Sequence, residues 1–373
     1  MNLPKHYKGK WSCTTDSLYN EKTLIGRLHK YFSAYFETFS APSAEMLFLL
    51  ILSILALESA HSIRFLYRHF LSGITTKSLN AFYYACSYAK VDCSGFMNVT
   101  AKIALHLIPE SLKSQPVFIC IDDTMVSKFG LKFENVSKLF DHAAHNGSNY
   151  LNGHCFVSLM LCIPVWSHDK ISYLAVPLGY RMWQKKEKVG DYYTGVRRVL
   201  TNLFGTREVL AYVTSTAWTG GTKRLFFSTI SPEELQIFCA WQESSPLNQT
   251  GSDRMKYIPL FLYSFRWNIE ISYYEQKTFW SLCSYMVRSC KGIEMMINLI
   301  NVAYCAMKLL PYQDESFSDF RDNSMQDFRF ALSEGIRQQV FFATLVQNIE
   351  TQIKSSSMIN ALKQAIVKQE HYL

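Results

Sequence analysis

The character of the chain changes abruptly at Pro116, and this change constrains the fold more than any other feature. Before it the apolar residues recur at helical spacing, whereas after it apolar runs of strand type follow one another. The runs are PVFICIDDT (116–124), HCFVSLMLCIPVW (154–166) and KISYLAVPLGY (170–180), and a Ser-His-Asp turn separates the last two. Three successive strands between helical segments predict an α/β fold.

The segment from Ser43 to about Leu112 is predicted to be helical. It contains MLFLLILSILAL (46–57), then SIRFLYRHFL and SLNAFYYACSYA on either side of a turn at Gly73. The first run is bounded by two glutamates and is shorter than the ~20 apolar residues of a membrane span, so we interpret it as a buried helix capped at Ser43. The region carries four basic residues: Arg64, Arg68, Lys77 and Lys90. Short basic helices are typical of a DNA-binding module, but a plain helical bundle gives the same pattern.

The chain after Tyr180 begins with a basic stretch, RMWQKKEKVGDYYTGVRR. Two further strands are predicted, EVLAYVTST (208–216) and RLFFSTI (224–230), joined by a hairpin at a Gly-Gly pair. SPEELQIFCAWQ (231–242) opens with a capping pattern and is predicted to be a helix. Beyond Pro259 the pattern is helical almost to the end of the chain.

Composition indicates a globular protein, with 49% hydrophobic and 18% charged residues. A net charge of +8 over 373 residues suits a polyanionic partner without requiring one. The ten cysteines form no C-x-x-C pair, and no signal peptide is evident. We therefore expect a cytoplasmic protein with free thiols and no membrane segment.

Four residues at a fixed spacing carry the strongest chemical signal: Tyr263, Arg266, Glu270 and Lys277, in the pattern Y-(2)-R-(3)-E-(6)-K. On a helix these offsets place all four side chains along one stripe. A carboxylate among cations on one stripe suits a divalent metal beside phosphates. The alternative is a solvent-exposed helix on which Arg266 and Glu270 form an ordinary ion pair. The apolar neighbours Trp267, Ile269, Phe279 and Trp280 favour a helix packed against a core.

A second signal lies where the first predicted strand ends, at Ile121-Asp122-Asp123-Thr124. Successive side chains of a strand point to opposite faces, so only one aspartate can face a given site. The alternative is a pair of turn aspartates that end a strand.

The four-residue spacing matches the YREK signature of a large branch of bacterial insertion-sequence transposases of the DDE type, and the chain resembles that family over most of residues 43–350. The resemblance implies an RNase H-like mixed sheet with an N-terminal helical region and a helical C-terminal segment. It implies that Asp123, which directly precedes a threonine, and Glu270 bind the metal and act in catalysis. Arg266 and Lys277 would contact DNA phosphates, and Tyr263 would position them.

The resemblance also implies cofactors and partners. Two Mg²⁺ or Mn²⁺ ions would act on phosphodiesters of the transposon's terminal inverted repeats and of target DNA. A homodimer is compatible with this activity. The domains expected are 1–112, a helical region with a DNA-binding role, 113–290, the transposase domain, and 291–373, a C-terminal helical segment.

The chain departs from the family pattern after Tyr180. The family's second aspartate ends a parallel strand that is reached through a helix, and no apolar run ending in an acid follows here. We interpret this as an internal deletion near 186–190, with Asp191 as a weak substitute in a turn. We therefore expect a transposase that is defective in strand cleavage. The alternative is a catalytically inactive DNA-binding remnant, or an inhibitor of an intact transposase.

Two weaker patterns have ordinary explanations. His142, His145 and His154 lack the further ligands of a tetrahedral zinc site, so we expect them to line a loop beside the active site. The densest basic strip suits DNA phosphates or a solvated loop, and consists of Arg181, Lys185, Lys186, Lys188, Arg197 and Arg198. The sequence contains no P-loop, no G-x-S-x-G and no dinucleotide fingerprint.

Overall fold

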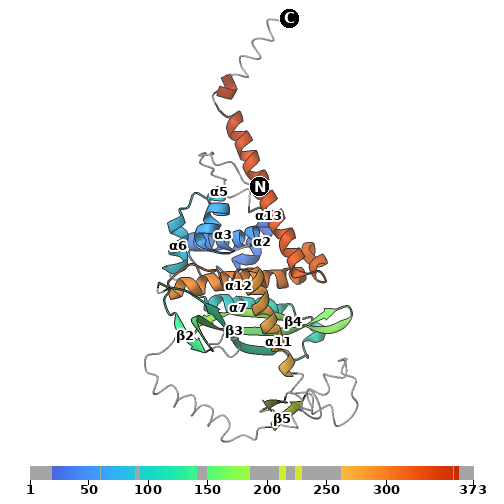
Figure 1. The fold of residues 1–373 in the computed structure, drawn as a ribbon. Coiled ribbons are helices and arrows are strands. Elements are labelled where there is room, and N and C mark those ends of the chain that lie inside the picture. Colours follow the sequence, from blue (N-terminus) through green and yellow to red (C-terminus); the bar gives the residue numbers. More distant parts are fainter. Residues whose placement is uncertain are drawn as a thin grey trace. The chain divides into compact units, whose positions relative to one another are not determined.

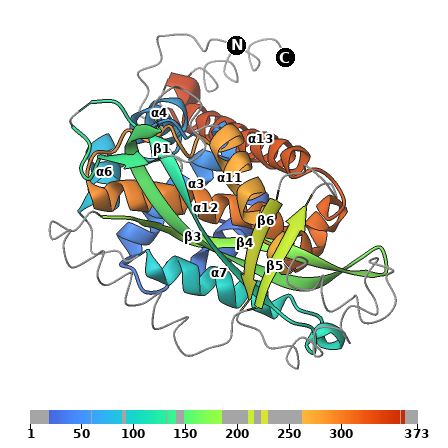
Figure 2. The same cartoon turned by 60° about the horizontal axis from the view of Figure 1, so that its bottom comes forward.

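The fold is mixed α/β, with many helices and a small antiparallel sheet (Figures 1 and 2). The computed structural model describes residues 19–58, 60–88, 93–130, 132–140, 149–184, 210–215, 223–228, 262–355 and 357–360. The chain divides into two compact units, one of residues 1–100 with 276–373 and one of residues 101–275. The N-terminal and C-terminal helices, which the sequence analysis treats as separate regions, thus belong to one unit.

In the described residues, the N-terminal part of this helical unit consists of seven helical elements, three of which begin at a hydroxyl cap. They are α2 (Leu24–Ser33), α3 (Ala41–Leu57), α4 (Ile63–Leu66), the π-helical turn η1 (Tyr67–Leu71), α5 (Ser72–Ile74), α6 (Leu79–Ser87) and the start of α7 (Ser94–His106). The hydroxyls of Thr23, Ser62 and Ser78 accept hydrogen bonds from the first turns of α2, α4 and α6. The sequence SIRFLYRHFL is therefore not one regular helix.

Helix α3 begins earlier than predicted. Its N-cap is Ser40 and not Ser43, and Pro42 lies in its first turn, where a missing backbone N–H does no harm. The helix is buried from Leu47 to Ala56, as the sequence analysis expected of this run.

The C-terminal part of the helical unit contains α12 (Cys290–Gln313), the 3₁₀ helix η3 (Glu315–Phe320) and α13 (Met325–Ile353). Helix α12 contacts α3, α6 and α13, and it lies among them in Figure 1. Of the described helices it is the one long and apolar enough to cross a membrane, yet 89% of its most apolar window is buried inside the protein. The core helix of a soluble protein has the same properties, so the finding is consistent with a soluble protein.

The second unit is built on one long central strand. β3 (Tyr150–Ser167) pairs antiparallel with β1 (Phe118–Ser127), with β4 (Lys170–Met182) and with the short β2 (Ser137–Phe140), and Figure 2 shows β3 beside β1 and β4. The three predicted strands are confirmed, and β3 turns into β4 at His168 and Asp169, both with positive φ. β2 was not predicted, and it lies between the first two predicted strands, where the sequence analysis predicts no strand or helix.

One correction concerns the end of β1. The strand does not end at the aspartates but continues to Ser127, because Thr124 and Val126 are buried and Met125 still pairs with Cys155. Every strand pairing in the described residues is antiparallel, whereas an RNase H-like sheet is mixed. The stretch of the proposed deletion near 186–190 and the turn expected at Asp191 lie outside the described residues.

The remaining elements agree with the sequence where they are described. β5 (Leu210–Ser215) and β6 (Lys223–Ser228) form the predicted antiparallel pair as a separate sheet. The helix predicted at 231–242 lies outside the described residues. Helix α11 (Trp267–Phe279) contains Glu270 and Lys277.

Candidate functional site

A row of polar side chains crosses one face of the sheet. Asp122 of β1 pairs with Ser158 of β3, and Ser158 in turn pairs with Tyr180 of β4. Directly paired residues of neighbouring strands share a face, so all three side chains point to the same side. Ser158 and Tyr180 are each 1% exposed. The row is therefore a polar strip inside an otherwise apolar layer.

The chain before α11 and the helix itself lie against this face. Phe265 stacks on Phe118 of β1 with ring centroids 4.3 Å apart and meets the Tyr173 ring edge-on at 5.1 Å. Nearly two turns into the helix, the Tyr273 ring lies 6.2 Å from that of Tyr180. These aromatic contacts hold the start of α11 over the row that contains Asp122.

The four signature residues do not all lie on one regular helix, which corrects the expectation of a single helical stripe. Successive i to i+3 backbone hydrogen bonds join Leu262 to Phe265 and Tyr263 to Arg266, so the chain forms a tight turn before α11 begins at Trp267. This turn brings Phe265 inward and Arg266 towards β1. Of the four apolar neighbours that suggested a packed helix, Ile269 and Trp280 are buried, whereas Trp267 and Phe279 are exposed.

Arg266 joins the strand to the helix through two carboxylates. Its Nη2 atom lies 2.7 Å from Asp122 Oδ2 and 3.1 Å from Glu270 Oε1. Since both oxygens contact one nitrogen, they are no more than about 6 Å apart, a span that two metal ions roughly 4 Å apart could share. The Asp122 side chain is 14% exposed, that of Arg266 36% and that of Glu270 42%. Burial lowers the pKa of Arg266, but Asp122, Tyr263 and Glu270 raise it, and the net pKa lies above its ordinary value.

Buried polar atoms without a well-aligned hydrogen bond gather at this place. Asp122 Oδ2, Ser158 Oγ and the Tyr273 hydroxyl all belong to this group. Burial raises the pKa of Tyr273 strongly, and Asp122, Asp123 and Glu270 raise it further, while the nearby Ser158 hydroxyl acts in the opposite direction. Tyr273 is therefore a neutral phenol within electrostatic range of three carboxylates. A cluster of buried polar groups of this kind suits a hydrated cation or ordered water.

Asp123 lies on the opposite face of β1 from Asp122. It is exposed, and its Oδ2 accepts a hydrogen bond from Cys155 Sγ at 3.2 Å. Burial, then the bond and charge of Asp123, raise the pKa of Cys155 to about 12, so the group remains a thiol. The described contacts thus bring Asp122, and not Asp123, into a bridged contact with Glu270. The shared metal site of Asp123 and Glu270 stays a prediction.

The other predicted residues are found in different surroundings. Tyr263 is 44% exposed, and its ring lies 5.8 Å from the Arg266 guanidinium. Lys277 is half-buried near the end of α11. His154 is 1% exposed and bonds to the Glu134 carbonyl oxygen at 2.8 Å, so it is a buried residue of β3 that contacts the segment between β1 and β2. His142, His145 and all of the basic strip except Arg181 lie outside the described residues.

Sequence reasoning missed Ser158, Tyr180 and Tyr273. Tyr273 could have been found, since it follows Glu270 by three residues and precedes Lys277 by four, on the same helical stripe. The two strand residues carry no such signal, because their role depends on register. Among the described residues, no three of His, Cys, Asp and Glu gather as a ready metal-ligand group.

Comparison with known protein families, with characterised proteins and with solved structures gave no match to this chain.

Proposed function

We propose that this chain is a DNA-binding protein of the DDE transposase type, built on an RNase H-like core, and that it is defective in strand cleavage. The observation that carries the proposal is the contact of Arg266 with both Asp122 and Glu270. The helix that bears the transposase-like signature thereby lies against the strand that bears the paired aspartates. The ordinary explanation of Arg266 and Glu270 is a surface ion pair within one helix. That explanation does not account for the contact of Arg266 with Asp122 on β1.

The strand topology supports an RNase H-like core. β1 and β4 both pair antiparallel with the central β3, and the short β2 lies between β1 and β3 along the chain. An acidic pair lies on the first strand, and a late helix packs on the same face. The acid that faces this helix is Asp122, which we therefore propose as the strand ligand. Asp123, which the family resemblance favours, is the alternative.

The donor set fits Mg²⁺ or Mn²⁺. Asp122 and Glu270 offer carboxylate oxygens, the ligands that Mg²⁺ prefers, and one oxygen of each contacts the Arg266 guanidinium. Bound metal supplies Lewis-acid activation of the attacking and leaving oxygens of a phosphodiester. In this arrangement the Arg266 cation holds the two carboxylates together, and the Tyr273 phenol can donate a hydrogen bond to a phosphate oxygen.

The DNA contacts proposed are those of Arg266, Lys277 and Tyr263, which all reach the surface in part. Their partners would be phosphates of transposon terminal inverted repeats and of target DNA. A cytoplasmic location and a homodimer are part of the same proposal.

The alternative is a catalytically inactive DNA-binding remnant, or an inhibitor of an intact transposase. It is favoured by the Arg266 side chain, which contacts both Asp122 and Glu270 and lies between them. In the described part of the chain, Asp123 is the one further acid whose charge reaches Tyr273. Losing one metal ligand should reduce transition-state stabilisation by several kcal/mol.

The test uses the full-length chain, Mn²⁺ and a duplex that carries the inverted repeats flanking this reading frame. We expect specific binding of the duplex and no 3′ nicking above that of a Glu270→Gln variant. Nicking that Glu270→Gln abolishes would show that the chain is active and that the proposed defect is wrong. In that case Asp122→Asn and Asp123→Asn would identify the strand ligand. A chain that binds no DNA in low salt would contradict the proposed function as a whole.

A further inference from the structure

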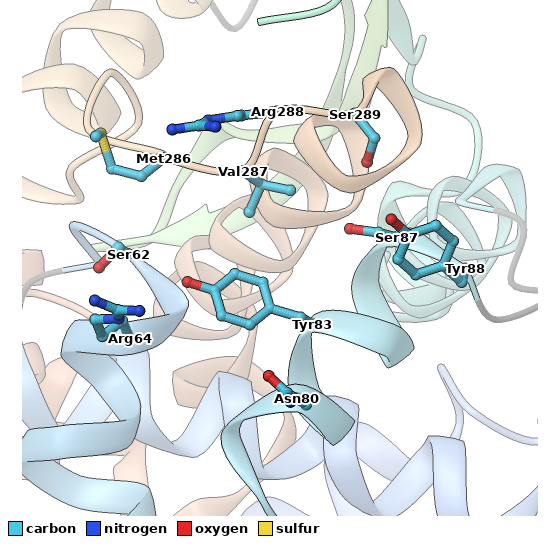
Figure 3. Close-up of a pocket in the computed structure, with 10 residues that line it drawn as sticks. All are labelled: Ser62, Arg64, Asn80, Tyr83, Ser87, Tyr88, Met286, Val287, Arg288 and Ser289. Carbon is cyan, nitrogen blue, oxygen red and sulfur yellow. The ribbon is translucent and has the colours of Figure 1, made fainter. Parts of the chain in front are cut away.

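A cavity of about 620 Å³ lies in the helical unit, and none of its lining residues belongs to the acidic site (Figure 3). Its walls come from α4, from α6 and from the segment 286–289 that precedes α12. Arg64 enters from α4, Asn80, Tyr83 and Ser87 from α6, and Arg288 from the segment before α12. Residues that are more than 200 positions apart along the chain therefore form one cavity.

The lining has an unusual charge balance. It contains two arginines, three serines, an asparagine and two tyrosines, and no aspartate or glutamate. Neither Arg64 nor Arg288 forms an ion pair with any residue that the structure describes, whereas nearby Lys77 pairs with Glu45 at 3.6 Å. Figure 3 shows the Tyr83 hydroxyl pointing to the same side as the two guanidinium groups. Two cations and several neutral donors around one opening, with no acid among them, suit an anion.

We propose that this cavity is a phosphate-binding site for the backbone of duplex DNA. The inference rests on the proposed function, in which DNA is the substrate, and it adds a second contact surface on the helical unit. Arginine, serine, asparagine and tyrosine side chains are the groups that proteins use to hold DNA phosphates. The two arginines lie on separate elements of the wall, which suits successive phosphates of a strand better than one small anion. Tyr88, at the rim, is 70% exposed, so the opening is accessible to a macromolecule.

The local structure keeps the site ready for binding. Ser289 caps α12 by accepting a hydrogen bond from the Gly292 amide, which fixes the segment that carries Arg288. Ser62 caps α4 in the same way through the Phe65 amide, close to Arg64. Both arginines are exposed, so their removal should not unfold the protein.

The test measures the salt dependence of binding of a fluorescent duplex of random sequence to the full-length chain. Each phosphate contact adds about 0.9 to the slope of log K against log salt concentration. The variant Arg64→Gln with Arg288→Gln should therefore lower the slope by about 1.8 and weaken binding at least roughly fivefold in moderate salt. The matched control is Arg68→Gln with Lys102→Gln, which removes the same charge from exposed residues outside the cavity lining. Circular dichroism and thermal unfolding confirm that both variants fold.

The outcomes separate this inference from the function on which it rests. If the wild-type chain binds duplex and the cavity variant binds equally well, the cavity inference is wrong and the proposed function stands. If both variant pairs lower the slope equally, the effect is one of net charge, and the inference is again wrong. A wild-type chain that binds no duplex contradicts both proposals. The last experiment measures the binding of inorganic phosphate alone. Saturable binding at submillimolar concentration that the cavity variant loses would assign the site to a free anion. That result would overturn the DNA assignment.

Discussion

The contact of Arg266 with Asp122 gives a prediction that can be tested without knowing the substrate. Replacing Arg266 by methionine keeps most of the side-chain volume and removes the cation, which leaves the largely buried Asp122 carboxylate without its partner. Unlike a solvent-exposed pair, such a carboxylate cannot recover its full hydration. We expect Arg266→Met to destabilise the protein at pH 7 by about 2 kcal/mol.

The size follows from the exposure of the groups. Unit charges about 4 Å apart attract by ~4 kcal/mol at an effective dielectric constant of about 20, and breaking a fully buried pair costs ~3–5 kcal/mol. The Arg266 side chain is 36% exposed, so solvent screens a substantial part of this interaction. We therefore expect a coupling free energy of about 1–2 kcal/mol between Arg266 and Asp122. The pair of Arg266 with the 42% exposed Glu270 should contribute only about 0.3–0.5 kcal/mol.

The assay is a double-mutant cycle in urea unfolding, with Arg266→Met, Asp122→Asn and the double variant. Asp123→Asn is the matched control, because it makes the same chemical change one residue along the strand, on the opposite face. Its coupling with Arg266 should be below about 0.5 kcal/mol. A coupling with Asp123 larger than that with Asp122 would refute the arrangement of β1 and α11 described above.

Four further predictions follow from individual contacts. Tyr273→Phe removes a buried hydroxyl that makes no well-aligned hydrogen bond, so unfolding free energy should stay within about 1 kcal/mol or rise, and a larger loss would contradict this. Gly153→Ala should destabilise by at least about 2 kcal/mol, because a Cβ would lie 2.1 Å from the Val126 carbonyl oxygen, whereas Gly95→Ala, with open space around it, should be neutral or stabilising. A hydrogen bond with Cys162 is the largest cause that lowers the pKa of Cys120, whereas Cys155 has a pKa of about 12 and stays a thiol. Cys120 should therefore react with iodoacetamide at pH 8 well before Cys155. Equal labelling rates of the two cysteines by mass spectrometry would contradict this prediction. Mn²⁺ binding, followed by electron paramagnetic resonance of the free ion, should weaken at least about tenfold in Asp122→Asn and less in Asp123→Asn, and the reverse order would restore Asp123 as the strand ligand.

The strands β3 and β4 could be predicted because each contains a long run of buried residues. The apolar runs that became β3 and β4 are long and are bounded by turn residues, and both strands lie where the pattern predicts them. β2 could not be predicted in this way, because four residues with two of them apolar, Leu139 and Phe140, do not establish a period. The end of β1 was predicted too early in the sequence. Two adjacent aspartates resemble a turn, whereas pairing with β3 carries the strand past them.

Helix boundaries depended on details that the apolar pattern does not contain. Ser40 and Ser43 are both possible caps, and the choice between them rests on Pro42, which is favourable in a first turn. α2 was missed although Ile25, Leu28 and Phe32 form its buried stripe, because the aromatic residues around it hide the spacing. The turn before α11 depends on a tertiary contact, the stacking of Phe265 on Phe118, which no local pattern could indicate.

At the candidate site, the sequence motif predicts which helix residues are neighbours, whereas the strand register determines which aspartate they contact. The spacing of the four signature residues identified Arg266 and Glu270 as neighbours, but it could not say which aspartate they meet. That choice depends on a shift of a single residue, since such a shift would exchange the two faces of β1. In the described register Ile119 and Ile121 are 64% and 65% exposed, and they lie on the same face as Asp123. A register shifted by one would bury both isoleucines and bring Asp123 to α11. Cysteine introduced at position 121 tests this independently of any metal or DNA: rapid labelling supports Asp122 as the acid beside Arg266, and protection comparable to that of Cys155 would support Asp123.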